Sequence, residues 1–373
     1  MSTLTGSAAD APTVLTSPPT LSEVLAAETS GPDGPHEDLA ALVERLAGAC
    51  VGIAEVLGRG ALAGLAARTG TVNVQGEQQA GLDLLADRRF AEAVAGQGLV
   101  AGLVSEERAT VQVVEPGPAG EGRRGRYLIS FDPLDGSSNI DTDVSVGSIF
   151  SIQEDPDPAA ALGPEAFLQP GRRQVAAGYA LYGPSTLLVL SLGRGTHGFT
   201  LDRQAGRFLL THPDLRVPSR AAEFAINASN ARFWEPAVTR YVEECLAGAS
   251  GPRGRDFNMR WVASLVAEAH RVLIRGGVFL YPRDGRSSRG SGKLRLLYEA
   301  DPIGFLIEQA GGRASDGERP VLDVQPRSIH ERTGLVFGSA PEVERIEAYH
   351  RDHNVRPFDA PLFGVRGLFR RPA

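Results

Sequence analysis

Lysine is almost absent from this sequence, because Lys293 is the one lysine among 38 basic residues and all the others are arginines. The arginines are scattered among acidic residues and the net charge is −7, so the composition argues against a nucleic-acid-binding surface. Cysteine is also scarce. Cys50 and Cys245 lie far apart in apolar helical patterns, which predicts two buried free thiols and excludes a disulfide framework.

Long apolar runs are missing as well. No stretch reaches the roughly 18 apolar residues of a membrane-spanning helix, and the N-terminal region lacks the basic start and apolar run of a secretory signal. Hydrophobic residues make up 42% of the chain and charged residues 22%, which is typical of a globular protein. We therefore expect a cytoplasmic protein in a reducing compartment.

The 373 residues exceed one average domain, and the pattern along the chain divides them into three parts. Residues 1–36 are rich in Ser, Thr, Pro, Gly and Ala, which predicts a disordered tail with a short helix near residues 21–28. Residues 37–214 open with helical spacing and continue with apolar runs bounded by turn residues, which predicts an α/β domain with a large sheet. Residues 215–373 alternate helical and strand patterns and predict a second α/β domain.

These patterns also predict the individual elements. Helices are expected over residues 37–57, 82–94, 235–246, 258–274 and within 301–312, the last with Asp301 as its N-cap and Gly311 and Gly312 as its stop. Strands are expected over residues 110–114, 127–131, 146–152, 175–183, 186–192, 197–202, 207–212 and 277–282.

The stretch with the most chemistry is YLISFDPLDGSSNIDTD, residues 127–143, where an apolar strand ends in an acidic turn. Pro133 and Gly136 force the chain to turn, so Asp132 and Asp135 are presented together at the strand end. Two carboxylates in a tight turn can hold a hard cation, and the small residues after them leave backbone N–H groups for an anion. An Asx turn without a ligand and a phosphotransferase that forms an aspartyl-phosphate fit the same spacing. The acids do not alternate as they do in a calcium-binding EF-hand.

Histidine offers no competing site in the sequence. His197 and His212 follow strand patterns, His270 lies in a helical pattern, and none pairs with Ser and Asp at a recognisable spacing. Because the motifs are rich in acids and hold no histidine cluster, magnesium is favoured over zinc.

Six strings occur in order along the chain: NVQGEQQAGLD, LVSEE, FDPLDGSSNID, NMRWVASLVAEAHR, GGVFLYP and GKLRLLYEADP. Together they resemble the class I fructose-1,6-bisphosphatases of the metal-dependent, lithium-sensitive sugar and inositol phosphatase superfamily. The resemblance runs from about residue 37 to about residue 350. It implies a sugar phosphatase fold, in which two α/β domains form an alternating αβαβα sandwich. It also implies Mg²⁺-dependent hydrolysis of the 1-phosphate of D-fructose 1,6-bisphosphate by metal-activated water, without a covalent enzyme intermediate.

The resemblance further implies which residues hold the metal and handle the attacking water. Roughly two or three Mg²⁺ ions, which Mn²⁺ can replace, are expected on six ligands: Glu106, Glu107, Asp132, the carbonyl of Leu134, Asp135 and Glu299. Asp83 is expected to work with Glu107 on the proton of the water. Glu77 stands where many members carry Asp on a mobile loop, and Arg295 is expected to secure that loop or the reacting phosphate.

For the substrate, the resemblance points to a set of contacts around both phosphates and the sugar: Asp135, Gly136, Ser137, Ser138, Asn227, Arg260, Trp261, Tyr281 and Lys293. Arg260 is expected to reach in from a neighbouring subunit of a homotetramer. Trp261 departs from the tyrosine of better-known members, although its indole N–H still donates one hydrogen bond. Lys293 carries a compact ammonium where the guanidinium of arginine, a wide planar fork, is expected not to fit.

Regulation and substrate range stay open at this point. Arg126 and Tyr127 match the basic-Tyr pair that binds AMP in class I enzymes, but the preceding loop lacks the familiar Thr-Gly-Glu string. The activity suits gluconeogenesis, and a bifunctional variant that also accepts sedoheptulose 1,7-bisphosphate suits the Calvin cycle. A related inositol or nucleotide phosphatase and a non-catalytic phosphosugar-binding protein are the alternatives, and the last predicts loss of metal acids that this chain retains.

Overall fold

The computed structural model of the chain describes residues 18–30, 37–63, 68–72, 78–115, 124–220, 222–283, 285 and 292–352. Among the helices of these segments, none has the length and apolar character that a membrane crossing requires.

The first half of the chain builds an eight-stranded sheet. Its strands are β3 (Val100–Ser105), β4 (Gln112–Val113), β5 (Tyr127–Asp135), β6 (Val146–Glu154), β7 (Gln174–Tyr182), β8 (Thr186–Ser191), β9 (Thr196–Asp202) and β10 (Arg207–Leu215). Their order in the sheet is β10-β9-β8-β7-β6-β5-β3-β4, with β3 and β5 parallel and the other neighbours antiparallel. The central strands are buried on both faces, which explains why they read as continuous apolar runs in the sequence.

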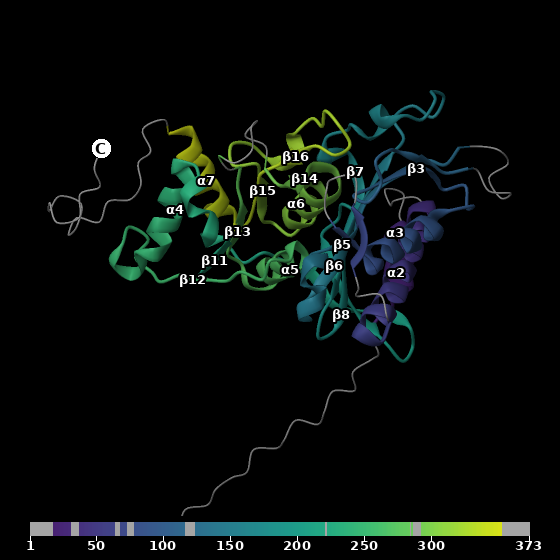
Figure 1. The fold of residues 1–373 in the computed structure, drawn as a ribbon, viewed down its shortest axis with the longest axis horizontal. Coiled ribbons are helices and arrows are strands. Elements are labelled where there is room, and N and C mark those ends of the chain that lie inside the picture. The colour runs from purple at the N-terminus through teal and green to yellow at the C-terminus, as the bar shows by residue number, and fades with distance from the viewer. Residues whose placement is uncertain are drawn as a thin grey trace, which may run out of the picture.

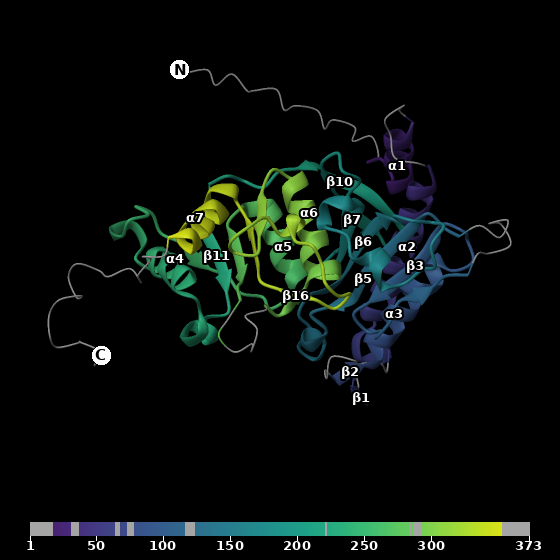
Figure 2. The same ribbon diagram turned by 90° about the horizontal axis from the view of Figure 1, so that it is seen from above.

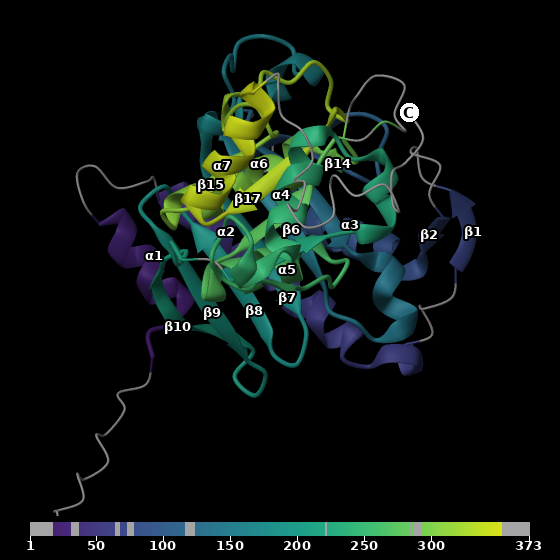
Figure 3. The ribbon, with the colours of Figure 1, turned by 90° about the vertical axis from the view of Figure 1, so that its left-hand side faces the viewer.

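Helices cover the outer face of this sheet. They are α1 (Leu21–Thr29), α2 (Glu37–Leu57) and α3 (Gly81–Val94), and a separate antiparallel pair of strands, β1 (Arg68–Val72) and β2 (Gln78–Ala80), precedes α3. The apolar face of α2 packs on α3, and Phe90 of α3 stacks on Phe131 of β5 at 5.0 Å between ring centroids. In Figure 3 α1 lies beside β10, while β1 and β2 lie at the opposite side of the molecule.

The second half builds a five-stranded sheet in the order β12-β11-β13-β17-β15. Its strands are β11 (Glu223–Ile226), β12 (Asn258–Met259), β13 (Val278–Tyr281), β15 (Arg313–Ser315) and β17 (Leu335–Gly338). Its helices are α4 (Pro236–Leu246), α5 (Leu265–Arg275), α6 (Asp301–Gln309) and α7 (Ala340–Arg351). A short strand, β14 (Leu294–Arg295), pairs with β16 (Arg332–Thr333) and directly precedes a π-helical segment over Leu296–Ala300 that leads into α6.

The two halves stack into five alternating layers, as the predicted αβαβα sandwich requires. Figure 1 shows α4 and α7 at one end, then the smaller sheet, then α5 and α6, then the large sheet, and α2 and α3 at the other end; the view from above in Figure 2 gives the same order. One hydrophobic cluster contains residues of α5, α6 and both sheets, so these two helices join the halves. The predicted fold class is confirmed.

Three local predictions differ from the structure. The expected helix over 258–274 begins only at Leu265, because Asn258 and Met259 pair in parallel with β11 and Ala263 has a positive φ of 60°. The expected strand over 110–114 is reduced to Gln112 and Val113, which pair at the sheet edge. Asp301 does not cap α6: Ala300 takes the N-cap position and the Asp301 side chain is buried.

Part of the expected N-terminal tail is also ordered. The helix predicted near 21–28 is present as α1, with Thr20 and Glu23 forming a capping box and Leu21 and Leu25 buried. The backbone of Pro19 accepts a hydrogen bond from Leu210 N of β10. The predicted disorder therefore does not extend over residues 18–30, and residues 1–17 and 31–36 lie outside the described ones.

A buried ion-pair network links α4 and α7 in the outer layer of the second half. Glu342→Ala is expected to lose much stability because it breaks this network. Arg253 Nη2 lies 2.5 and 2.6 Å from the carboxylate oxygens of Glu342, the Tyr241 hydroxyl donates to Glu342 at 2.7 Å, and both charged side chains are almost fully buried. Removing Glu342 strands a buried guanidinium, which is expected to lower the free energy of unfolding by about 3–5 kcal/mol. Urea unfolding followed by circular dichroism measures this change.

The control is Glu344→Ala, an exposed acid on the same helix, for which a change within about 0.5 kcal/mol is expected. Equal stability of the Glu342→Ala and Glu344→Ala proteins would contradict the role assigned to the network.

Candidate metal-binding active site

The acidic turn at the end of β5 is held in place by its neighbours. Leu134 N donates to Asp132 Oδ1 at 2.9 Å, and the Ser148 hydroxyl of β6 donates to the Pro133 carbonyl at 2.7 Å. Gly136 follows with a φ of 75°, a conformation that glycine adopts without steric cost. The turn therefore presents Asp132 and Asp135 as buried, fixed carboxylates.

Glu299 comes to this turn from the other half of the chain. It lies in the π-helical segment before α6, and the Arg295 backbone N–H donates to its Oε2 at 2.5 Å. Carboxylate oxygens of Asp132, Asp135 and Glu299 lie within 4.8 Å of one another, and all three residues are buried. The structure thus brings together three of the predicted metal ligands.

The charges in this cluster repel one another. Burial is the largest cause that raises the pKa of Asp132 and of Glu299 well above the ordinary range, and the Glu106 carboxylate adds to both shifts. Burial also raises the pKa of Asp135 to about 6, against hydrogen bonds that favour its ionised form. The Arg295 guanidinium, buried and 3.9 Å from Glu106 Oε1, supplies one positive charge. Because four carboxylates face one guanidinium, the donor set fits hard divalent cations that take oxygen ligands.

Asp135 also binds the start of α5, a contact that the sequence analysis missed. Its Oδ2 accepts hydrogen bonds from Val266 N at 3.0 Å and from the Ser264 hydroxyl at 3.3 Å. An anion at a helix N-terminus is stabilised by the free N–H groups and the helix dipole. Ser264, an N-cap residue before an apolar helical run, was the sequence signal for this contact. It was missed because the predicted helix began at residue 258 and so placed Ser264 inside it.

Two further predicted site acids, Asp83 and Glu107, lie on other elements of the first half. Asp83 is buried in the first turn of α3, and Glu107 follows Glu106 directly after β3, where its N–H donates to the Ser105 hydroxyl at 3.2 Å. Glu77 lies outside the described residues. The roles of these three acids stay predictions, as does that of the Leu134 carbonyl.

Five of the predicted substrate contacts lie either directly after the acidic turn or in a small pocket of the second half. Gly136, Ser137 and Ser138 follow the acidic turn and begin a short 3₁₀ segment, and they are half-buried or exposed. Asn227 and Tyr281 line a small pocket together with Asn230 and Trp234.

Of the other predicted substrate residues, Trp261 packs against β13, while Arg260 and Lys293 lie at the surface. Trp261 stacks on Phe279 with 5.9 Å between ring centroids and lies 6.1 Å from the Tyr281 ring. Arg260 is half exposed and makes a 3.5 Å ion pair with Glu223. Lys293 is exposed, and its backbone carbonyl accepts from Arg295 Nη1 at 3.2 Å.

The expected AMP-binding pair has an acidic partner. Arg126 makes an ion pair of 2.7 Å with Glu154, and Tyr127, the next residue, is buried and lies opposite Glu154 in the β5–β6 ladder. The Arg126 charge is therefore partly compensated within the described structure.

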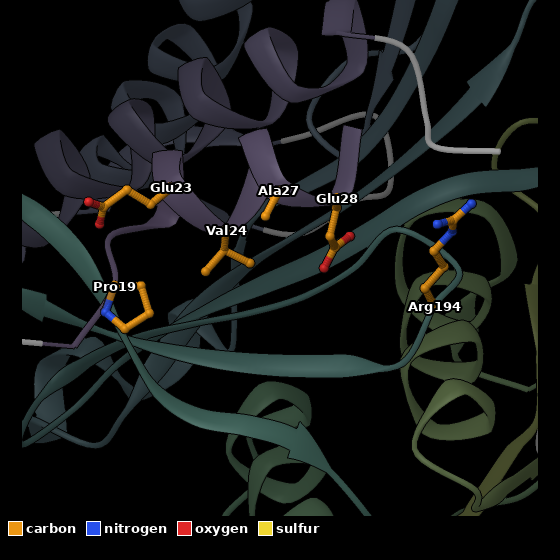
Figure 4. Close-up of a pocket in the computed structure, with 6 residues that line it drawn as sticks. All are labelled: Pro19, Glu23, Val24, Ala27, Glu28 and Arg194. Carbon is orange, nitrogen blue, oxygen red and sulfur yellow. The ribbon is translucent and has the colours of Figure 1, made fainter. Parts of the chain in front are cut away.

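A further pocket lies along α1 and contains none of the predicted site residues. It is lined by Pro19, Glu23, Val24, Ala27, Glu28 and Arg194, with Glu28 and Arg194 projecting from different elements (Figure 4). Glu28 pairs with His197 at 3.7 Å. Two acids and one arginine do not match the chemistry of the cluster around Asp132.

Comparison with known proteins gives one consistent result. Models of the fructose-1-6-bisphosphatase N-terminal and C-terminal domains match residues 19–213 and 217–351. The chain is 57% identical over 350 residues to a class 1 fructose-1,6-bisphosphatase of Methylibium petroleiphilum, covering 94% of this chain and 97% of that protein. It is 56% identical over 354 residues to the class 1 enzyme of Hydrogenophilus thermoluteolus, with coverage of 94% and 97%. The crystal structure of Leishmania major fructose-1,6-bisphosphatase in holo form has a TM-score of 0.81 and 35% identity, covering 90% of this chain and 99% of that one.

Divalent-cation binding to the metal-free protein is expected to weaken as the pH falls, because burial raises the pKa of all three cluster carboxylates. The pKa of Asp135 is raised to about 6, so its carboxylate is free for a cation above this pH and must lose a proton to bind one below it. The dissociation constant for Mn²⁺ is expected to rise by about tenfold per pH unit for each proton displaced. Electron paramagnetic resonance of free Mn²⁺ at about pH 7.5 and about pH 5 measures it.

Asp132→Asn is expected to weaken Mn²⁺ binding at both pH values, whereas Asp141→Asn, at an exposed acid of the same loop, is expected to leave it unchanged. Equal Mn²⁺ affinity of the Asp132→Asn and Asp141→Asn proteins would show that the cluster is not the cation site.

Proposed function

Because this chain belongs to the fructose-1,6-bisphosphatase family, we propose that it removes the 1-phosphate of D-fructose 1,6-bisphosphate at the cluster of Asp132, Asp135 and Glu299. The products are D-fructose 6-phosphate and inorganic phosphate. The observation that carries this proposal is the convergence of three buried carboxylates from both halves of the chain within 4.8 Å. It is supported by identities of 57% and 56% to class 1 enzymes over nearly the whole chain.

We infer that Mg²⁺ is the native metal, with Glu106, Glu107, Asp132, the Leu134 carbonyl, Asp135 and Glu299 as its ligands. When bound, such ions neutralise charge on the phosphoryl oxygens and lower the pKa of a coordinated water. The oxygen-only donor set of the described cluster favours Mg²⁺ or Mn²⁺ over zinc.

The protein residues then position the phosphate and move the proton. Gly136, Ser137 and Ser138 offer backbone N–H and hydroxyl donors to the 1-phosphate directly after the acidic turn. Glu107 and Asp83 accept the proton of the attacking water, and Glu77 is assigned as a further catalytic acid. Phosphoryl transfer needs positioning and charge stabilisation more than covalent chemistry, so no covalent enzyme intermediate is proposed.

The sugar and its 6-phosphate are assigned to the small pocket of the second half. Asn227 and Tyr281 line it, and Trp261 packs beside Tyr281. Arg260 is half exposed, which supports the proposal that it completes the site of a neighbouring subunit in a homotetramer. Light scattering that shows a monomer at assay concentrations would contradict that part.

We assign any AMP site to Arg126 and Tyr127, where Glu154 partly compensates the Arg126 charge and opposes the binding of a phosphate. Undiminished activity at millimolar AMP would remove it.

The function is tested by phosphate release from a panel of fructose 1,6-bisphosphate, sedoheptulose 1,7-bisphosphate, an inositol phosphate and a nucleoside 3′-phosphate. Release from fructose 1,6-bisphosphate is expected to depend on Mg²⁺ and to stop with EDTA. Asp132→Asn is expected to lower kcat at least about 100-fold, since a lost metal ligand forfeits several kcal/mol of charge stabilisation.

In that assay Asp141→Asn, the exposed acid, is the matched control and is expected to retain wild-type kcat. Activity that survives EDTA would overturn the mechanism. Comparable kcat/KM values for the two bisphosphates would identify the bifunctional variant, and preference for the inositol or nucleoside phosphate would replace the proposed substrate.

Lys293→Arg is expected to raise KM about tenfold with little change in kcat, because we assign the ammonium to the 6-phosphate or an adjacent sugar oxygen. A charge-assisted hydrogen bond of this kind contributes about 1.5–3 kcal/mol. The control is the reverse exchange, Arg327→Lys, at a side chain of the same half that is 85% exposed. A wild-type KM in Lys293→Arg would show that the lone lysine does not contact the substrate.

A further inference from the structure

His330 forms a bridge between the two halves of the chain beside the acidic cluster. Its Nδ1 lies 2.9 Å from the Tyr298 hydroxyl, and its Nε2 lies 3.3 Å from the carbonyl oxygen of Ala109. Tyr298 is fully buried and directly precedes Glu299. Ala109 stands in the turn after β3 that carries Glu106 and Glu107. One half-buried imidazole thus contacts both segments that supply metal ligands from opposite halves.

The hydrogen bonds fix the tautomer of the ring. A carbonyl can only accept, so Nε2 carries the proton that is donated to Ala109, and Nδ1 of the neutral ring accepts from the Tyr298 hydroxyl. Burial is the main cause that lowers the pKa of His330, and the nearby Arg295 charge adds to it, so the ring is neutral at neutral pH. The Tyr298 hydroxyl in turn interacts with the Arg295 side chain, which lies beside Glu106.

The surroundings make this bridge rigid. Ile329 and Tyr298 belong to a buried cluster with Val104 of β3, and Leu296 N donates to the Glu331 carbonyl at 2.8 Å. The backbone next to His330 is therefore hydrogen-bonded to the π-helical segment, which fixes the position of the imidazole.

The other end of the bridge is also anchored. On the far side of the Glu106 turn, Arg108 is paired with Asp87 of α3 at 2.7 Å. The turn is held by α3 through Arg108 and by the second half through His330.

We infer that His330 is a positioning residue, which holds the Glu106–Glu107 turn against Tyr298 and so sets the spacing between the carboxylates of the turn and Glu299. The inference rests on the proposed function in one respect, that these carboxylates bind the metal. Partners that orient metal ligands without touching the metal commonly change metal affinity or activity by about 10–100-fold when mutated. His330 fits that class because it contacts neighbours of ligands on both sides.

The test compares Mn²⁺ binding and metal-free stability in four single variants and one double variant. His330→Phe keeps a flat ring but loses both hydrogen bonds, His330→Gln keeps an amide donor and a carbonyl acceptor, and Tyr298→Phe removes only the hydroxyl. The control is His350→Phe, because His350 also uses both ring nitrogens, on Ile346 O at 2.9 Å and Glu235 at 3.1 Å, but lies in α7.

His330→Phe is expected to raise the Mn²⁺ dissociation constant about tenfold, with a metal-free unfolding midpoint like that of His350→Phe. His330→Gln is expected to stay within about threefold of the wild type, because both hydrogen bonds can re-form. Because the bridge needs both partners, the double variant Tyr298→Phe/His330→Phe is expected to bind Mn²⁺ no more weakly than His330→Phe alone.

Wild-type Mn²⁺ affinity in His330→Phe, or an equal loss in His350→Phe, would overturn the positioning role. If His330→Phe does not fold, Tyr298→Phe with unchanged Mn²⁺ affinity would overturn it as well. A wild-type protein that binds Mn²⁺ but releases phosphate from no substrate of the panel would refute the proposed function, while the Mn²⁺ measurements would still decide the role of His330.

Discussion

Repulsion between buried carboxylates is the constraint on which the rest of this structure depends. Asp132, Asp135 and Glu299 lie within 4.8 Å of one another, away from solvent, with Glu106 close enough to raise the pKa of two of them. Like charges at this distance in a low-dielectric interior oppose folding unless a counter-charge is present. Among the described residues, the Arg295 guanidinium lies 3.9 Å from Glu106 and offsets part of this charge. A divalent cation would provide the missing positive charge, so the repulsion that costs stability is consistent with the proposed metal site.

The fold meets this constraint by taking the acids from both halves and fixing each one separately. Asp135 is held by the first N–H groups of α5, and Glu299 is aimed by a π-helical turn and a hydrogen bond from the Arg295 backbone. The backbone hydrogen bonds of a π-helical segment span one more residue than those of an α-helix, and such segments often occur at functional sites. Because α5 and α6 also pack between the two sheets, the apolar layer that joins the halves is the same layer that assembles the site.

Much of this could be predicted from the sequence, since apolar runs and helical spacing report burial directly. The layered fold class and the acidic turn follow from such patterns and from the family resemblance. The start of α5 was wrong because the segment over 258–264 contains residues that suit a helix, while pairing with β11 and the positive φ of Ala263 prevent one. The roles of Ser264 and His330 could not be read either, because their partners, Asp135 and Ala109, lie 129 and 221 positions away in the chain.

The effective charge of a basic side chain is likewise difficult to predict from the sequence. A motif gives the identity of Arg126, but its effective charge depends on Glu154, which the β5–β6 register places beside it. A sequence motif can therefore identify a candidate phosphate-binding arginine, but the strand register determines whether a carboxylate already pairs with it. Lys293 has no such carboxylate partner among the ion pairs of the described residues, and its exposed ammonium carries a charge that the fold has not compensated there. An exposed cation without a carboxylate partner among the described residues is suited to an anion that arrives from solvent, which agrees with the proposed contact to a second phosphate group.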